Sequence, residues 1–174
     1  IALVFPMVML MQMLSSGAMG GGVSSAISRA LGAGDEKRAA TLALHALSIG
    51  AIAGISFTLL FNIFGGSIFY ALGGRGAVLD TAIVYARVAL SAAVLIWTVN
   101  TLASIVRGTG NMMVPSSALL GASLLQIVVG GALGLGIGPV PRFGIAGVAM
   151  GLVVGFSCAA IFGSNLPRWL MIAC

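Results

Sequence analysis

Polar and aromatic side chains within one apolar run could form a binding surface inside the molecule. Tyr85, Trp97, Asn100 and Ser104 lie in this run. At about 100° per residue, a helix would place the four side chains within an arc of roughly 120°. A hydroxyl or amide group in apolar surroundings costs free energy unless it faces a packed interior or a wet cavity. We therefore expect this arc to face inward.

Two amides in other apolar runs are natural companions of that arc. Gln12 and Gln126 lie near the middle of their runs. These groups would form either a site lined by neutral oxygens or hydrogen bonds between helices, which contribute about 0.6 kcal/mol on average in membranes. The residue pattern leaves both open. The candidate residues of a substrate or cation pathway are Tyr85, Asn100, Gln126, Gln12 and Trp97.

The residues that other chemistries require are missing. His45 is the sole histidine and has no second ligand at helical spacing, so a zinc site is not expected. Cys158 and Cys174 support neither a disulfide framework nor a thiolate metal site. Glycines near 32–34 and 134–138 are not followed by the Gly-Lys-Ser/Thr of a phosphate-binding loop. The sequence therefore predicts neither an enzyme nor a cofactor.

All three acidic residues lie at the ends of apolar runs. They are Asp35, Glu36 and Asp80. An ion-coupled transporter needs a group at membrane depth that binds H⁺ or Na⁺ and thereby changes its charge. The sequence offers no obvious group of this kind.

Five long apolar runs must position the candidate residues. They cover residues 1–27, 39–64, 81–106, 114–137 and 143–162. Each is close to the ~20 residues that a helix needs to cross ~30 Å of hydrocarbon. The chain is 60% hydrophobic and 6% charged, with a mean hydropathy of +1.18, whereas strands of a membrane barrel would alternate over about 10 residues. The sequence predicts an all-α polytopic membrane helix bundle with five transmembrane helices.

The net charge of +5 indicates membrane topology rather than nucleic-acid binding. The basic residues are scattered singly and form no stripe that could follow a phosphate backbone. One predicted side of the bundle carries Arg29, Lys37, Arg38, Arg107 and Arg168, and the other carries Arg75 and Arg142. By the positive-inside rule, the loop from Gly32 to Arg38 and the loop from Gly108 to Pro115 are cytoplasmic. The connection from Gly136 to Gly144 is predicted to be an extended extracellular loop.

Small residues recur every four positions along four of the runs. Such stripes allow helix backbones to approach closely in lipid, and glycines also permit a helix to bend during a working cycle. The stripes are Gly17, Gly21, Ser24 and Ser28; Gly50 and Gly54; Gly130, Gly134 and Gly138; and Gly147, Gly151, Gly155, Ala159 and Gly163. We expect them mainly to pack helices together.

The start of the sequence is typical of a fragment. It has no initiator Met, and it begins inside an apolar run that is too long for a signal peptide and has no basic flank.

The loop motifs resemble those of the multidrug and toxic compound extrusion (MATE) family of secondary transporters. Residues 28–35 read SRALGAGD, residues 107–111 read RGTGN with Pro115 following, residues 135–139 read LGIGP and residues 144–149 read GIAGVA. Each glycine motif is weak alone, but their order and spacing make a specific match over nearly the whole chain.

The resemblance implies the architecture and activity of a transporter. Members have twelve helices in two six-helix lobes around a central cavity, and they export amphipathic organic cations in exchange for H⁺ or Na⁺. By this resemblance, residues 1–174 are one membrane domain that supplies the second to sixth helices of an incomplete amino-terminal lobe. Its partners would be small organic cations, the coupling ion, the lipid bilayer, and the first helix and second lobe of the same transporter. The expected location is the bacterial cytoplasmic (inner) membrane.

The resemblance also gives roles to individual residues. Tyr85 and Asn100 match a Tyr and an Asn, fifteen positions apart, that take part in cation binding in some members. Gln126 and Gly130 stand where those members carry an Asn and, four positions later, an Asp. The lost carboxylate leaves room for ion coupling elsewhere. The alternative is a lipid-linked or polysaccharide flippase of the same broad superfamily, whose cavity would need several basic residues, although only Arg87 is available.

Overall fold

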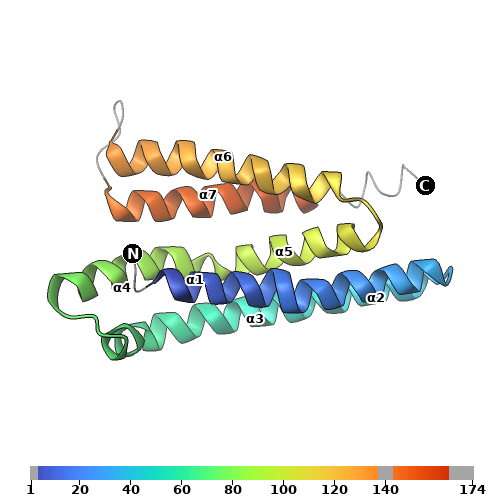
Figure 1. The fold of residues 1–174 in the computed structure, drawn as a ribbon, viewed down its shortest axis with the longest axis horizontal. Coiled ribbons are helices and arrows are strands. Elements are labelled where there is room, and N and C mark those ends of the chain that lie inside the picture. The colour runs from blue at the N-terminus through green and yellow to red at the C-terminus, as the bar shows by residue number, and fades with distance from the viewer. Residues whose placement is uncertain (1–3, 137–142, 165–174) are drawn as a thin grey trace.

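The computed structural model describes residues 4–136 and 143–164, which form a bundle of antiparallel helices without strands (Figure 1). The elements are α1 (Phe5–Gln12), the π-helix η1 (Met13–Met19), α2 (Gly20–Gly32), α3 (Glu36–Ala71), α4 (Gly76–Ser91), α5 (Ala93–Gly108), α6 (Met113–Leu135) and α7 (Ile145–Ser164). The predicted all-α fold class is confirmed.

The five predicted runs correspond to five helical segments. By length and composition, α3 and α6 can each cross a membrane, and α4 with α5 can form a third span. The first run is divided among the consecutive elements α1, η1 and α2, and α7 is a shorter apolar helix. Most of the predicted extracellular loop from Gly136 to Gly144 lies outside the described residues, as do Arg142, Arg168 and Cys174.

Local side-chain chemistry sets the helix ends. The Asp35 carboxylate accepts a hydrogen bond from the Arg38 backbone N–H at 2.9 Å and caps the start of α3. At the other end of α3, the Arg75 guanidinium donates to the Tyr70 carbonyl oxygen at 2.6 Å and lies 3.7 Å from the centre of the Tyr70 ring. Gly136 ends α6 with φ +70°, a conformation that favours glycine.

Two serines accompany the π-helix in the first segment. The hydroxyls of Ser15 and Ser16 donate to the Gln12 carbonyl oxygen at 3.3 and 2.6 Å. Serine hydroxyls that bond to the preceding turn compete with backbone N–H groups for the same carbonyl, which loosens the α-helical pattern. The widened turn of η1 follows directly after Gln12.

The third run is bent, whereas its sequence indicates one straight helix. The axes of α4 and α5 differ by 43°, with Ala92 between them. The Thr58 hydroxyl of α3 donates to the Leu90 carbonyl oxygen at 3.1 Å, so a side chain supplies a donor beside the bend. A Cβ atom added to Gly54 of α3 would lie 2.7 Å from Val94 Cα. Packing against α3 therefore accompanies a bend that no proline or glycine marks in the run.

Helix α5 lies at the centre of the bundle. It contacts η1, α2, α3 and α7, and to a smaller extent α4 and α6. Helices α6 and α7 form an extensive pair, which packs on α4 and α5 through α7 (Figure 1). One cluster of buried side chains joins α1, α3, α4, α5, α6 and α7.

Small-residue stripes bring two of these helix pairs together. A Cβ atom on Gly147 of α7 would lie 2.6 Å from the Leu133 carbonyl carbon of α6, and one on Gly50 of α3 would lie 2.6 Å from Thr101 Oγ1 of α5. Packing is thus confirmed for the glycines at 50, 54, 130, 134, 147, 151 and 155, whereas Gly138 lies outside the described residues. Gly17 and Gly21 differ, because a Cβ atom on either would meet nothing within 4 Å.

Adding a single methyl group tests the packing of α3 on α5. Gly54→Ala places Cβ against the Val94 backbone, and we expect it to destabilise the fold by about 1–3 kcal/mol. The control Gly121→Ala, on an exposed position of α6 with nothing within 4 Å, should be neutral or stabilise by up to about 1 kcal/mol through helix propensity. Thermal unfolding in detergent measures both. Equal stability of the two variants would contradict the packing.

Candidate functional site

Asn100 forms a buried polar contact between α5 and the first helical segment. Its side-chain Nδ2 donates to Gln12 Oε1 at 3.0 Å and to Ser15 Oγ at 2.8 Å. Asn100 is 4% exposed and Ser15 is 1% exposed. These residues are far apart in sequence, so the hydrogen bonds fix how the two helices face each other.

The polar contact continues along α5 toward its end. Ser104 is fully buried and donates from Oγ to the Asn100 carbonyl oxygen at 2.7 Å. Arg107 Nη2 donates to Ser104 Oγ at 2.7 Å. Together with Gln12 and Ser15, these residues form a connected group that we call the Asn100 cluster. Its side-chain hydrogen bonds satisfy groups that would otherwise be costly in an apolar interior.

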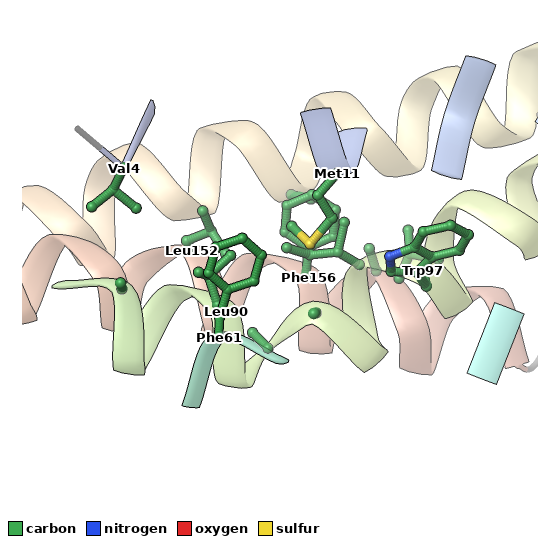
Figure 2. Close-up of a cluster of buried hydrophobic side chains, with 14 of the residues drawn as sticks. Val4, Met11, Phe61, Leu90, Trp97, Leu152 and Phe156 are labelled. Atoms are coloured by element: carbon green, nitrogen blue, oxygen red, sulfur yellow. The ribbon is translucent and has the colours of Figure 1, made fainter. Parts of the chain in front are cut away.

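Trp97 lies one turn before Asn100, on the apolar side of the site. It belongs to the same buried cluster as Met11 and Phe156 (Figure 2). Its ring centre lies 6.0 Å from that of Phe57, at an interplanar angle of 44°. The indole Nε1 is buried and has no hydrogen-bond partner in the described chain. Trp97 is 5% exposed, so its ring packs in the apolar core and its Nε1 is a donor without a partner among the described residues.

Tyr85 does not join the Asn100 cluster. It is half-buried on α4 and packs against the apolar core. Fifteen residues of helix span roughly 22 Å, so Tyr85 and Asn100 could share a face without touching. The 43° bend then turns α4 away from the line of α5. The two residues form no hydrogen bond with each other in the described part of the chain.

Gln126 also lies at another interface. Its Cβ would lie 3.3 Å from a Cβ atom added to Gly155, which places Gln126 against α7. Among the described residues, it forms no hydrogen bond with the Asn100 cluster. Gly130, one turn later, is buried where α6 meets α7, and a Cβ atom there would lie 3.3 Å from the Val148 carbonyl oxygen. Glycine at this position therefore serves the close approach of two backbones and leaves little room for a carboxylate.

The structure adds two members that sequence reasoning missed. Ser15 accepts a hydrogen bond from Asn100, and Arg107 extends the cluster beyond Ser104. Ser15 lies three positions after Gln12, a spacing that signals a shared helix face. Arg107 was interpreted only as a topology signal. The cluster offers neutral oxygens, amide donors and one guanidinium; among residues 4–136 and 143–164, no group of three or more His, Cys, Asp or Glu could hold a metal ion.

Comparisons with known proteins find a matching family and matching structures. The family model MatE matches residues 1–131. An inward-facing structure of a multidrug resistance MATE family transporter of the MOP superfamily is 32% identical, with a TM-score of 0.88 over 94% of this chain and 36% of that chain. The outward-facing structure of such a transporter is 31% identical, with a TM-score of 0.84 over 94% of this chain and 35% of that chain.

A further similar structure comes from Pyrococcus furiosus. It is described as a MOP superfamily transporter in which the reverse polarity of the binding pocket suggests a different function. The identity is 30% and the TM-score is 0.84, over 99% of this chain and 36% of that chain. No curated protein matches the sequence. The chain spans about a third of the length of the solved structures that it resembles.

A double-mutant cycle tests the contact between Ser15 and Asn100. Ser15→Ala and Asn100→Leu each remove one side of the 2.8 Å hydrogen bond. We expect a coupling free energy of about 0.6 kcal/mol, and below about 2 kcal/mol, as for other hydrogen bonds between membrane helices. Thermal unfolding of the four proteins in detergent gives this coupling. Ser123→Ala is the control, because the exposed Ser123 hydroxyl bonds within its own helix to Leu119 O. Coupling between Asn100 and Ser15 no larger than that with Ser123 would contradict the contact.

Proposed function

Because the chain belongs to the MATE transporter family, we propose that it is part of a multidrug efflux antiporter. The transporter exports amphipathic organic cations in exchange for H⁺ or Na⁺, and it is not an enzyme. The observation that carries this proposal is the shared helix arrangement, with 32% identity over 94% of the chain, with a multidrug resistance transporter.

The chain supplies one incomplete lobe of this transporter. The chain corresponds to 36% of the length of a solved relative. In this proposal, the helices of the transporter outside residues 1–174 also contribute to the transport cycle. We assign residues 1–174 to the second to sixth helices of the amino-terminal lobe. The first helix and the second lobe are then partners of this domain.

Within the Asn100 cluster, the proposed polar wall of the cation pathway consists of Asn100, Gln12 and Ser15. Asn100 uses Nδ2 for both of its side-chain hydrogen bonds, and its Oδ1 accepts none from a described residue. A neutral oxygen in an apolar setting attracts a cation without requiring a full counter-charge. Trp97, one turn away, supplies an indole ring, and the face of such a ring attracts organic cations. Tyr85 and Gln126 lie apart from the cluster, so their proposed role in the cation pathway is at other positions along it.

The flippase alternative is less well supported by the described residues. Arg87 is exposed on α4 and borders a separate pocket of about 160 Å³ with Asn62 and Phe69. Arg107 is the single basic residue in the Asn100 cluster. A cavity for a pyrophosphate-linked lipid would need a denser positive charge than these two separated arginines provide.

The proposed location is the bacterial cytoplasmic membrane, with two loops on the cytoplasmic side. The turns that follow α2 and α5 lie at the same end of the bundle (Figure 1). Arg29, Lys37, Arg38 and Arg107 belong to this end. This grouping supports the orientation in which the loop from Gly32 to Arg38 and the loop from Gly108 to Pro115 are cytoplasmic.

Transport by the complete protein in vesicles tests the proposal. Efflux of a fluorescent amphipathic cation should follow an imposed H⁺ or Na⁺ gradient, each applied separately. Asn100→Leu removes the free amide oxygen at similar volume, and we expect the efflux rate to fall about tenfold or more, as for a lost hydrogen bond to a charged group. Ser123→Ala is the matched control and should transport normally.

Three outcomes would contradict the proposal. The complete protein could show no gradient-driven efflux, or Asn100→Leu could transport as well as the control. The 174 residues alone could also transport, although they correspond to 36% of the length of a solved relative.

A further inference from the structure

A polar groove opens along one face of the first helical segment. Its volume is about 540 Å³, and its lining combines four serines and two glycines of η1 and α2 with Arg107 of α5. The serines are Ser16, Ser24, Ser25 and Ser28. We call it the α2–α5 groove. The concentration of hydroxyl groups around one guanidinium distinguishes it from the largely apolar surface of the helices.

Arg107 carries a positive charge without a carboxylate partner. Its hydrogen bond in the described chain is the one that Nη2 donates to Ser104 Oγ at 2.7 Å. A guanidinium has five N–H donors, so several remain for another acceptor. Asp35 caps α3, Glu36 begins that helix, and Asp80 lies in α4. None of these acidic residues pairs with Arg107.

Buried contacts hold the guanidinium at the groove. Ser104, whose Oγ accepts the hydrogen bond from Arg107, is fully buried. The same hydroxyl donates a hydrogen bond to the Asn100 carbonyl oxygen. A Cβ atom on Gly20 would lie 2.6 Å from Ser104 Oγ and 3.5 Å from Arg107 Nη2. Glycine at position 20 therefore gives Arg107 access to the groove. The next residue, Gly21, faces open space within it.

The serines offer adjustable hydrogen-bond donors. Ser24 Oγ forms no hydrogen bond with a described residue. The hydroxyls of Ser25 and Ser28 donate to carbonyl oxygens of their own helix, at 3.0 and 3.1 Å. Such hydroxyls can rotate toward a stronger acceptor. The Arg107 guanidinium, together with several hydroxyl groups, is a set of hydrogen-bond donors that suits a tetrahedral oxyanion.

The surrounding charge favours the same ligand. Arg107 lies in the last turn of α5, and Arg29 lies in the last turn of α2. Lys37 and Arg38 are exposed at the start of α3, at the same end of the bundle (Figure 1). Basic pockets between membrane helices near the membrane surface attract anionic head groups.

We propose that the α2–α5 groove binds a phosphate group, with Arg107 as its charge partner and the serine hydroxyls as additional donors. The phosphate belongs either to an anionic phospholipid or to a free phosphate ion. This groove is distinct from the binding site of the exported cation, because the positive charge of Arg107 would repel a cation. It does not depend on the proposed transport activity.

Binding to the purified complete protein tests the site. Short-chain phosphatidylglycerol, short-chain phosphatidylcholine and inorganic phosphate are titrated separately onto the protein in neutral detergent, and Kd is measured by calorimetry. Saturable binding of phosphatidylglycerol alone assigns the site to a lipid, and binding of inorganic phosphate as well assigns it to the free ion. Absence of saturable binding by either anionic probe would overturn the proposal.

Two variants with different mechanisms locate the binding. Arg107→Gln removes the charge, and we expect it to weaken binding about tenfold or more. Gly21→Leu fills the groove at a position where an added Cβ atom meets nothing within 4 Å, so it should block binding while the protein stays folded, as circular dichroism can verify. Arg29→Gln is the control, because Arg29 lies at the same end of α2 but outside the groove lining. It should change Kd less than about threefold. An equal increase in Kd for Arg107→Gln and Arg29→Gln, or an unchanged Kd for Gly21→Leu, would overturn the proposed site.

Discussion

The central position of α5 constrains the rest of the bundle. This helix contacts η1, α2, α3 and α7, so polar side chains on it must find partners on neighbouring helices. Asn100 meets this requirement through Gln12 and Ser15 of the first segment. Glycines meet the accompanying steric requirement, because Gly50 and Gly54 of α3 lie against Thr101 and Val94. Hydrogen bonds thus orient α5, and small residues on the neighbouring helix allow its close approach.

The same constraint gives the first helical segment two different faces. One face carries Gln12 and Ser15 to the buried amide of Asn100. The adjoining face, with Gly21 and Ser24, is left as the open α2–α5 groove. Ser104 and Arg107 connect the two, because the guanidinium that borders the groove is bonded to the buried line of α5. A change in the groove therefore has a direct structural route to the Asn100 cluster.

Features determined by local chemistry were predictable from the sequence. The Asp35 cap, the five helical segments and most small-residue packing follow from residue type and spacing. The grouping of Tyr85 with Asn100 assumed a straight helix, and the bend at Ala92 depends on contacts from α3 that no local signal reveals. Gln126 was predicted to join the polar arc only because it lies near the middle of its apolar run. Its observed position against α7 results from the glycines of that helix.

The arrangement of the bundle depends most on α5 packing directly against the first segment at Gly20 and Ser104. A Cβ atom on Gly20 would lie 2.6 Å from Ser104 Oγ, so cysteine side chains at these two positions would lie next to each other. In a version with Cys158 and Cys174 replaced by serine, Gly20→Cys with Ser104→Cys should cross-link under mild oxidation in membranes. Gly22→Cys with Ser104→Cys should not, since a Cβ atom on Gly22 would meet nothing within 4 Å. Equal cross-linking of both pairs, or none in the first, would contradict the central placement of α5.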